Sequence, residues 1–316
     1  MGQPEFTAVV TCYFEEHSID EFHARLSKAL HATGRSFEIV MVNDGSTDRT
    51  YALLNRIFDS DPRVSCIVDM FKNYGQGAAI AAGVAQANGR HFIFMDSDLQ
   101  LDPEELPLLL AEFDAGCDSV NGIRRGRRDS FFRRVASRIA SIGLRRAADA
   151  PLEDPGCTFR IMHGNLIRGL ALGPERVFNQ IEIISKVGRH KEVPVTHHAR
   201  QYGKSGWTFR KLFDFYMESL VNMSTRPFQA LAAFVLAIAC IGVLRVIVGL
   251  WVDFAIVPNV TNGLILNVVV IVGLFNLAVM ALTGEFVIRS FRSTQGSPKY
   301  VIREVRRKAD ASGGVS

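Results

Sequence analysis

The chain reads His91-Phe92-Ile93-Phe94-Met95-Asp96-Ser97-Asp98-Leu99-Gln100, an apolar run that ends in a short acidic segment. The apolar residues predict a buried β-strand. Alternate residues of an extended chain face the same way, so we expect Asp96, Asp98 and Gln100 to point three oxygen-bearing side chains into one space. Such hard ligands suit Mg²⁺ or Mn²⁺, which keep positions open for phosphate oxygens. The stretch therefore predicts metal-assisted chemistry on a diphosphate, with Asp96 and Asp98 as catalytic residues.

Strand-like and helix-like segments alternate on both sides of this stretch. The predicted strands cover residues 8–11, 37–42, 64–68 and 91–95, and the predicted helices cover 18–33, 48–60 and 75–88. A further helix is expected after Asp102, with Pro103 in its first position and Glu105 closing a capping box. The alternation predicts an α/β fold with a mostly parallel, Rossmann-like sheet, whose ligands bind at the carboxyl ends of the strands.

Two long apolar segments stand in the last third of the chain. Residues 228–252 carry one charged residue, Arg245, and residues 263–288 carry one, Glu285. Each segment is long enough to cross a hydrocarbon core of about 30 Å as a helix. The connecting residues 253–262 contain no lysine or arginine, whereas basic residues flank both outer ends. The positive-inside rule therefore places both ends of this hairpin in the cytosol.

These segments divide the chain into four predicted parts. They are a cytosolic catalytic domain at 1–227, transmembrane helices at 228–252 and 263–288, and a cytosolic basic tail at 289–316. Residues 1–6 lack a basic start and a long apolar run, so no signal peptide is expected. The five cysteines are scattered and form no CxxC pair, which indicates reduced packing residues rather than disulfides or zinc ligands. The predicted location is the cytoplasmic (inner) membrane, as a multi-pass protein.

Four segments carry a resemblance to a known family. They are Val42-Asn43-Asp44-Gly45-Ser46-Thr47-Asp48, Asn73-Tyr74-Gly75-Gln76-Gly77-Ala78, Met95-Asp96-Ser97-Asp98-Leu99-Gln100 and, beyond the apolar segments, Pro298-Lys299-Tyr300. In order and spacing they resemble family-two glycosyltransferases with the GT-A fold, of the dolichol-phosphate mannose synthase and bactoprenol glucosyltransferase type. The resemblance implies an inverting enzyme that transfers a sugar from a UDP- or GDP-linked donor to a polyprenyl phosphate, undecaprenyl or dolichyl, at the cytoplasmic face of the membrane.

The resemblance also implies roles for single residues. It assigns Glu15, Asp44 and Asp96 to the nucleotide, Asp96, Asp98 and Gln100 to the metal and diphosphate, and Arg200, Lys204 and Ser205 to a loop over the diphosphate. Two departures concern the nucleotide contacts. The first strand ends in Thr11-Cys12-Tyr13-Phe14-Glu15 instead of Pro-x-x-Asn-Glu, and Asn43 stands where the family has the first aspartate of its Asp-Asp-Gly-Ser motif.

A basic amphipathic stretch follows the fourth predicted strand. Nine arginines lie between Arg124 and Arg146, interleaved with apolar residues. This pattern predicts an interfacial helix at about 130–148, and a second one is expected at 208–226. Nucleic acid is the other usual partner of such a patch, but the adjacent apolar segments favour lipid, and the net charge is only +4.

The same stretch is the expected binding site for the acceptor. Guanidinium groups bind phosphate through paired hydrogen bonds. The resemblance implies that Arg124, and Arg133 or the adjacent Arg134 together with Ser137, hold the phosphate of the acceptor lipid. A phosphate monoester has a second pKa of about 6, so it is already an anionic nucleophile at neutral pH and needs alignment more than a general base.

Asp154, in Asp154-Pro155-Gly156-Cys157-Thr158-Phe159-Arg160, is the position nearest the reaction in the family's pattern. The resemblance implies that its carboxylate orients the sugar or stabilises positive charge at the anomeric carbon. We therefore expect in-line attack on that carbon with inversion and without an obligatory base. The sugar, the prenyl length and the oligomeric state, a homo-oligomer included, stay open at this stage.

The sequence disfavours several alternatives to these predictions. The stretch 75–80 is close to a dinucleotide fingerprint, but Ile80 occupies the third small position and two complete βα units precede it. The pair His197-His198 has no third metal ligand near it in sequence. A membrane polysaccharide synthase of this fold usually carries Gln-x-x-Arg-Trp, which this chain lacks. A non-catalytic scaffold or flippase partner is disfavoured by the intact acidic segment at 96–100.

Overall fold

The computed structural model describes residues 2–125, 152–170, 172–199 and 298–308, with residue 234 and single positions between 269 and 291. The chain forms two compact units: residues 1–219 with 297–316, and residues 220–296. Within the described ranges, no helix combines the length and the apolar character that a membrane crossing needs.

The predicted membrane-associated segments fall wholly or partly outside the described residues. They are the spans at 228–252 and 263–288 and the interfacial helices at 130–148 and 208–226.

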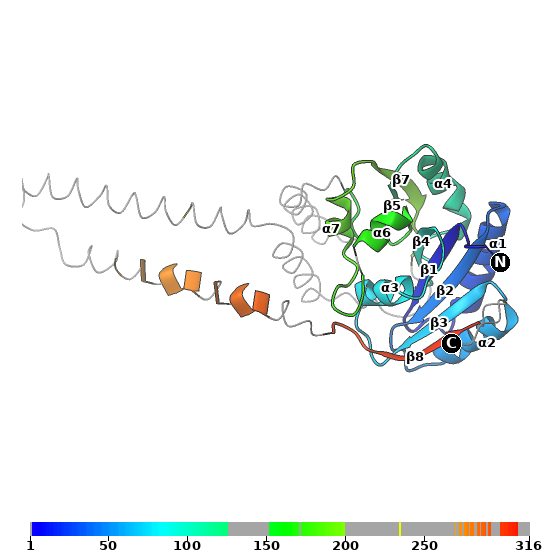
Figure 1. Ribbon diagram of the computed structural model, residues 1–316, viewed down its shortest axis with the longest axis horizontal. Helices are drawn as coiled ribbons and strands as arrows, with labels where there is room; N and C mark the ends of the chain where they lie inside the picture. Colours follow the sequence, from blue (N-terminus) through cyan, green and yellow to red (C-terminus); the bar gives the residue numbers. More distant parts are fainter. Residues whose placement is uncertain are drawn as a thin grey trace, which may run out of the picture. The chain divides into compact units, whose positions relative to one another are not determined.

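One sheet of eight strands runs through the described part of this unit (Figure 1). Its spatial order is β7-β5-β6-β4-β1-β2-β3-β8. The strands are β1 (Phe6–Cys12), β2 (Phe37–Asn43), β3 (Val64–Met70), β4 (His91–Asp96), β5 (Ser119–Arg125), β6 (Arg160–Met162), β7 (His190–Thr196) and β8 (Ile302–Arg307). β4, β1, β2 and β3 are parallel neighbours, as are β5 and β7, whereas β6 and β8 are antiparallel to the strands beside them. The predicted α/β class with a mostly parallel sheet is confirmed.

Helices cover both faces of the central strands. The helical elements are α1 (Ile19–Ala32), α2 (Thr50–Ser60), α3 (Gln76–Val84), η1 (Pro103–Glu105), α4 (Leu106–Asp114), α6 (Gly164–Gly169) and α7 (Gln180–Ile184). One apolar cluster joins α1, α2 and α4 to the sheet through residues such as Phe22, Leu54 and Leu109. A second cluster places the small residues of α3 against Val40 and Val42. Each fully buried Phe or Leu contributes about 1.5–3 kcal/mol, so these clusters stabilise the strand ends that carry the polar residues.

Helix α3 is shorter than the sequence predicted, because it ends at Val84 instead of near residue 88. The backbone N–H of Asn88 donates to Glu38 Oε1 at 2.5 Å, and that of Gly89 donates to Thr7 Oγ1 at 2.8 Å. A Cβ at Gly89 would lie 2.4 Å from the same oxygen. The chain therefore leaves the helix early to make these contacts with β1 and β2.

The predicted capping box at Asp102 and Glu105 is wrong. Neither side chain bonds the start of a helix: Asp102 pairs with Arg25 of α1, and Glu105 accepts hydrogen bonds from Thr196 of β7. The turn that follows is a 3₁₀ helix, and α4 begins only at Leu106. The two carboxylates therefore bind residues of distant elements, Arg25 and Thr196, instead of capping a helix.

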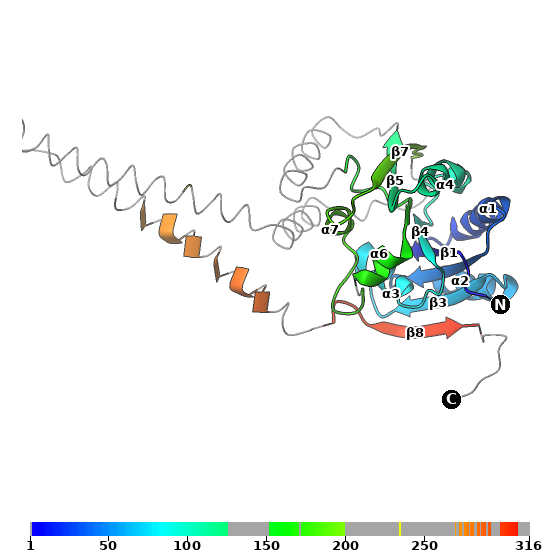
Figure 2. The same ribbon diagram turned by 45° about the horizontal axis from the view of Figure 1, so that its top comes forward.

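Strand β8 comes from the predicted basic tail and forms one edge of the sheet beside β3 (Figure 2). It pairs with residues 66–70, and the preceding Tyr300 is only 2% exposed. The chain therefore returns to the first unit after residues 220–296, and both ends of that segment are attached to the same folded unit.

Candidate functional site

The acidic segment stands at the carboxyl end of β4, between β1 and β6 in the sheet. The prediction that it stays extended to residue 100 is wrong. β4 ends at Asp96, Leu99 has a positive φ of 57°, and the N–H of Gln100 donates to Asp98 Oδ1 at 3.1 Å. A local turn, rather than strand alternation, therefore sets the positions of Asp98 and Gln100 relative to Asp96.

Asp96 is held by two neutral donors. The hydroxyl of Thr11 donates to its Oδ1 at 2.5 Å, and the amide of Gln76 donates to both carboxylate oxygens at 2.6 and 2.7 Å. Sequence analysis gave neither residue a role, although Gln76 lies inside a segment that carries the family resemblance. Neutral donors orient the carboxylate without cancelling its charge, so this donor set fits a divalent cation. In the described ranges no group of three or more His, Cys, Asp or Glu residues could hold a metal ion by themselves.

Asp44 organises the loop that precedes α3. Its Oδ1 accepts the N–H of Tyr74 at 2.8 Å, and its Oδ2 accepts the side chain of Asn73 at 2.9 Å and the N–H of Gly75 at 3.0 Å. Glu15, the other residue assigned to the nucleoside, is 7% exposed and accepts the hydroxyl of Ser18 at 2.6 Å. Both carboxylates thus lie at the carboxyl ends of β1 and β2, where they shape the loops around the site.

Gly45 lies in the turn that follows β2, against the loop that precedes α3. It has a φ of +69°, and a Cβ added there would lie 2.2 Å from the backbone carbon of Lys72. Gly45→Ala is expected to destabilise the protein by more than the roughly 1–3 kcal/mol of left-handed strain and to weaken nucleotide binding, because the loop at 72–75 must move. Thermal unfolding and nucleotide titration measure the two effects.

Gly34→Ala is the matched control. Gly34 has the same φ of +69° but no atom within 4 Å of the added Cβ. It is expected to show the strain alone, with nucleotide affinity unchanged. Equal losses of stability in the two variants would contradict the close contact at Lys72.

Arg124 and Asp154 form a bidentate ion pair at the end of β5. The guanidinium donates to the two carboxylate oxygens at 2.7 Å each, and the Arg124 N–H adds a third bond at 3.2 Å. Burial lowers the pKa of Arg124, but the hydrogen bonds and charge of Asp154 outweigh it, and the pKa is raised. The structure thus brings together two residues that the sequence assigned separately, to the acceptor phosphate and to the sugar.

Arg160 of β6 is a buried cation that sequence analysis missed. It is 2% exposed, its guanidinium lies 5.2 Å from the ring centroid of Phe178, and burial lowers its pKa to about 10. It pairs in the sheet with Phe94, two residues before Asp96, and the charges of Asp96 and Asp154 act on it. Its position on the face of the sheet that carries Asp96 makes it a source of positive potential beneath the site.

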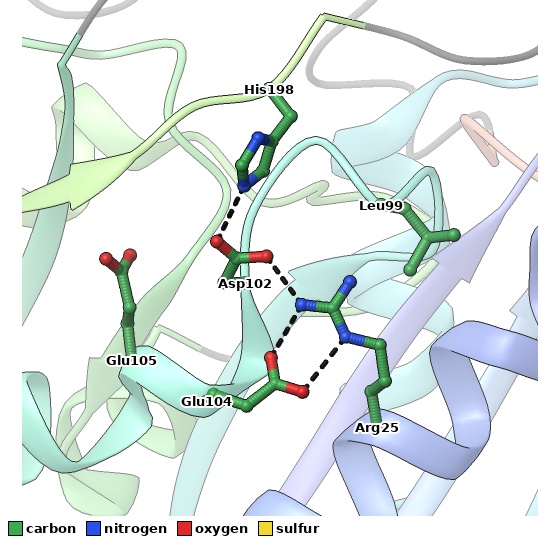
Figure 3. A pocket seen from close by; sticks show the side chains of 6 residues that line it. All are labelled: Arg25, Leu99, Asp102, Glu104, Glu105 and His198. Carbon is green, nitrogen blue, oxygen red and sulfur yellow. Dashed lines mark hydrogen bonds and ion pairs between the residues drawn. The ribbon is translucent and has the colours of Figure 1, made fainter.

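An open pocket of about 480 Å³ lies beside the acidic segment (Figure 3). It is lined by Arg25, Leu99, Asp102, Glu104, Glu105 and His198. Arg25 donates to Asp102 at 2.5 Å and to Glu104 at 2.9 Å, and His198 pairs with Asp102 at 2.7 Å. The hydrogen bond to Glu104 is the main cause of a raised pKa for Arg25. Neither Asp96 nor Asp98 lines this pocket.

His197 and His198, which precede the predicted diphosphate loop, contact the acidic segment. The N–H of His198 donates to the carbonyl of Gln100 at 2.9 Å, and His197 bridges to Leu101. The histidine pair therefore fastens the end of β7 to the acidic segment. Six predicted site residues lie outside the described residues, namely Arg133, Arg134, Ser137, Arg200, Lys204 and Ser205.

Comparison with known proteins adds three findings. The family model described as "Glycosyl transferase family 2" matches residues 7–171. Undecaprenyl-phosphate 4-deoxy-4-formamido-L-arabinose transferase from Edwardsiella ictaluri is 30% identical over 95% of this chain and 94% of that protein. The transferase of the same name from Pseudomonas paraeruginosa is 32% identical over 97% of this chain and 91% of that protein.

A solved structure shares the fold. Glucosyl-3-phosphoglycerate synthase from Mycobacterium tuberculosis, in complex with Mn²⁺, uridine-diphosphate-glucose and phosphoglyceric acid, aligns with a TM-score of 0.52 at 19% identity. The alignment covers 70% of this chain and 78% of that one. At this identity the likeness establishes the arrangement of strands and helices.

Proposed function

The chain belongs to glycosyl transferase family 2 and has its GT-A fold, and from this premise we propose that it transfers a sugar from a nucleotide-sugar to undecaprenyl phosphate. The observation that carries the proposal is the extent of the match. Relatives named for transfer to undecaprenyl phosphate align over 95% and 97% of the chain, which includes the apolar segments as well as the catalytic domain.

The donor side of the proposed site is the carboxyl end of β4. Asp96, Asp98 and Gln100 would hold Mg²⁺ or Mn²⁺, which when bound stabilises the negative charge that builds on the diphosphate as the sugar leaves. Thr11 and Gln76 keep the Asp96 carboxylate in place for this role. A GT-A structure that binds Mn²⁺ with a nucleotide-sugar supports the assignment by analogy of fold.

The acceptor side is proposed at the end of β5. Residues 126–151 leave β5 directly after Arg124 and Arg125 and return just before Asp154. The basic stretch that is proposed to hold the lipid phosphate, with Arg133, Arg134 and Ser137, therefore starts and ends beside the Arg124–Asp154 pair. In this arrangement Asp154 keeps Arg124 oriented, and Arg124 is proposed to contact the incoming phosphate.

The proposed reaction needs no obligatory general base. An oxygen of the lipid phosphate attacks the anomeric carbon in line, the bond to the nucleoside diphosphate breaks, and the configuration inverts. The phosphate is anionic near neutral pH, since its second pKa is about 6. The chain's part is to align the two anions and to exclude water. Arg200, Lys204 and Ser205, which follow His198 in the sequence, are proposed to close over the leaving diphosphate.

The path of the chain supports membrane attachment by a hairpin. Strand β8 belongs to the same unit as β1 to β7, so the segment between them begins and ends on that unit. Any crossing of a membrane within residues 220–296 must then be paired with a return. The proposed location is the cytoplasmic membrane, with the catalytic domain and both termini in the cytosol.

The test is transfer by the purified full-length chain in lipid nanodiscs. Undecaprenyl phosphate is supplied with a panel of donors: UDP-glucose, UDP-N-acetylglucosamine, GDP-mannose and nucleotide-linked 4-deoxy-4-formamido-L-arabinose. We expect one donor to give an alkali-stable glycosyl monophosphate lipid, identified by mass spectrometry, and EDTA to abolish its formation. Label in a polymer would instead indicate a polysaccharide synthase, and no transfer from any donor would contradict the proposal.

A further inference from the structure

A buried carboxylate links the proposed nucleotide-binding loop, residues 43–46, to strand β8. Asp69, in β3, is 1% exposed. The side-chain amide of Asn43 donates to its Oδ1 at 2.7 Å, and the guanidinium of Arg303 in β8 donates to its Oδ2 at 3.0 Å. Burying a carboxylate is costly unless it is paired and hydrogen-bonded, so both partners help to stabilise the Asp69 side chain inside the sheet.

The link continues from Asn43 into the loop that carries Asp44. The Oδ1 of Asn43 accepts the N–H of Ser46 at 3.2 Å, which closes the turn around Gly45. Asp44 then binds the backbone of residues 74 and 75. The contacts therefore run without interruption from Arg303 through Asp69 and Asn43 to the two loops at the carboxyl ends of β2 and β3.

This arrangement explains why asparagine stands at position 43. An aspartate there would place a second carboxylate against Asp69 in a buried setting, where like charges disfavour each other. The amide supplies what the site needs, because it donates to Asp69 and accepts from Ser46 at the same time.

Strand β8 is well placed to hold Arg303 against Asp69. Its backbone pairs with residues 66–70 of β3, and the hydroxyl of Tyr51 donates to Glu304 at 2.9 Å. Arg306, three residues further on, contacts Asn55 and Asp59 of α2 and does not contact Asp69. The strand follows residues 220–296 in the chain, so Arg303 is supplied to the catalytic unit by the segment that comes after the apolar region.

We propose that Arg303 is a positioning residue for donor binding, acting through Asp69 and Asn43 on the nucleotide-binding loop at residues 43–46. The proposal rests on the proposed function. The segment that returns from the apolar region thereby completes the donor site, although no atom of it needs to touch the nucleotide.

The test compares Arg303→Met with Arg306→Met in the full-length chain. Arg303→Met is expected to raise the KM for the nucleotide-sugar about tenfold, as suits the loss of a hydrogen bond to a charged group, with the KM for undecaprenyl phosphate unchanged. Arg306→Met removes an arginine from the same strand and is expected to leave both constants near wild type. Equal changes in the two variants would mean that Arg303 only anchors β8, and the proposal would fail.

Exchanging the amide and the carboxylate between positions 43 and 69 is a second test of the proposal. Asn43→Asp alone is expected to raise the donor KM at least as much as Arg303→Met, whereas Asn43→Asp combined with Asp69→Asn restores one carboxylate and one amide and should recover most of the affinity. No recovery would also overturn the proposal. Titration of UDP and GDP in the presence of Mn²⁺ separates the proposed function from the proposed role of Arg303. A wild-type chain that binds neither nucleotide contradicts the proposed function. Unchanged nucleotide binding by Arg303→Met contradicts only the role of Arg303.

Discussion

Asp98→Asn is expected to lower the rate of sugar transfer by about 10²–10³-fold, the size typical of losing one electrostatic contact to charge that develops in a transition state. The substitution keeps the oxygen that accepts the N–H of Gln100, so the turn after β4 should persist. What is lost is the negative charge available to a divalent cation. Steady-state kinetics at a series of Mn²⁺ concentrations should show both a lower kcat and a weaker apparent affinity for the metal.

Asp118→Asn is the control for this prediction. Asp118 lies at the opposite end of β5 from the site and forms an exposed ion pair with Arg189, so its loss should affect neither kcat nor the metal dependence. An Asp98→Asn enzyme with wild-type kcat would remove Asp98 from the metal site.

Asp154→Asn is expected to reduce both turnover and stability. Arg124 would stay buried with its counter-charge gone, and breaking one side of a buried pair costs about 3–5 kcal/mol. In a domain of this size that corresponds to a fall in Tm of roughly 10 °C. The same change frees Arg124 from a fixed orientation beside the acceptor phosphate, so kcat should fall even at temperatures where the variant is fully folded.

The double variant Arg124→Gln and Asp154→Asn separates the two effects. Removal of both charges should recover much of the lost stability, because no uncompensated charge stays buried. It should recover none of the activity if the pair serves the reaction. A double variant as active as wild type would show that the pair only stabilises the end of β5.

The parts of the fold that sequence analysis predicted are those with local signals. Strands β1 to β4 are apolar runs, and β2 and β4 end at the polar residues Asn43 and Asp96, on the edge that parallel strands share. Gln76 was within reach of the same reasoning, since its motif had been identified, but the contact with Asp96 joins residues from different elements. Contacts between side chains of different elements produce no periodic pattern in a sequence.

The parts that were missed depend on partners distant in the chain. Strand β8 is rich in arginine, and its sequence is typical of a basic tail. It lies beside β3 because it pairs with residues more than 200 positions earlier in the chain. The carboxylates of Asp102 and Glu105 matched a cap signal, but Arg25 and Thr196 bind them instead. Local propensity is a weak guide where such tertiary contacts compete.

The carboxylates at the end of β4 are proposed to hold a divalent cation together with the nucleoside diphosphate. The most direct measurement is electron paramagnetic resonance of Mn²⁺ titrated into the full-length chain, with and without UDP or GDP. We predict that nucleotide converts free Mn²⁺ into one bound ion per chain, and that Asp96→Asn and Asp98→Asn each lose this binding. Undiminished Mn²⁺ binding in both variants would contradict the account.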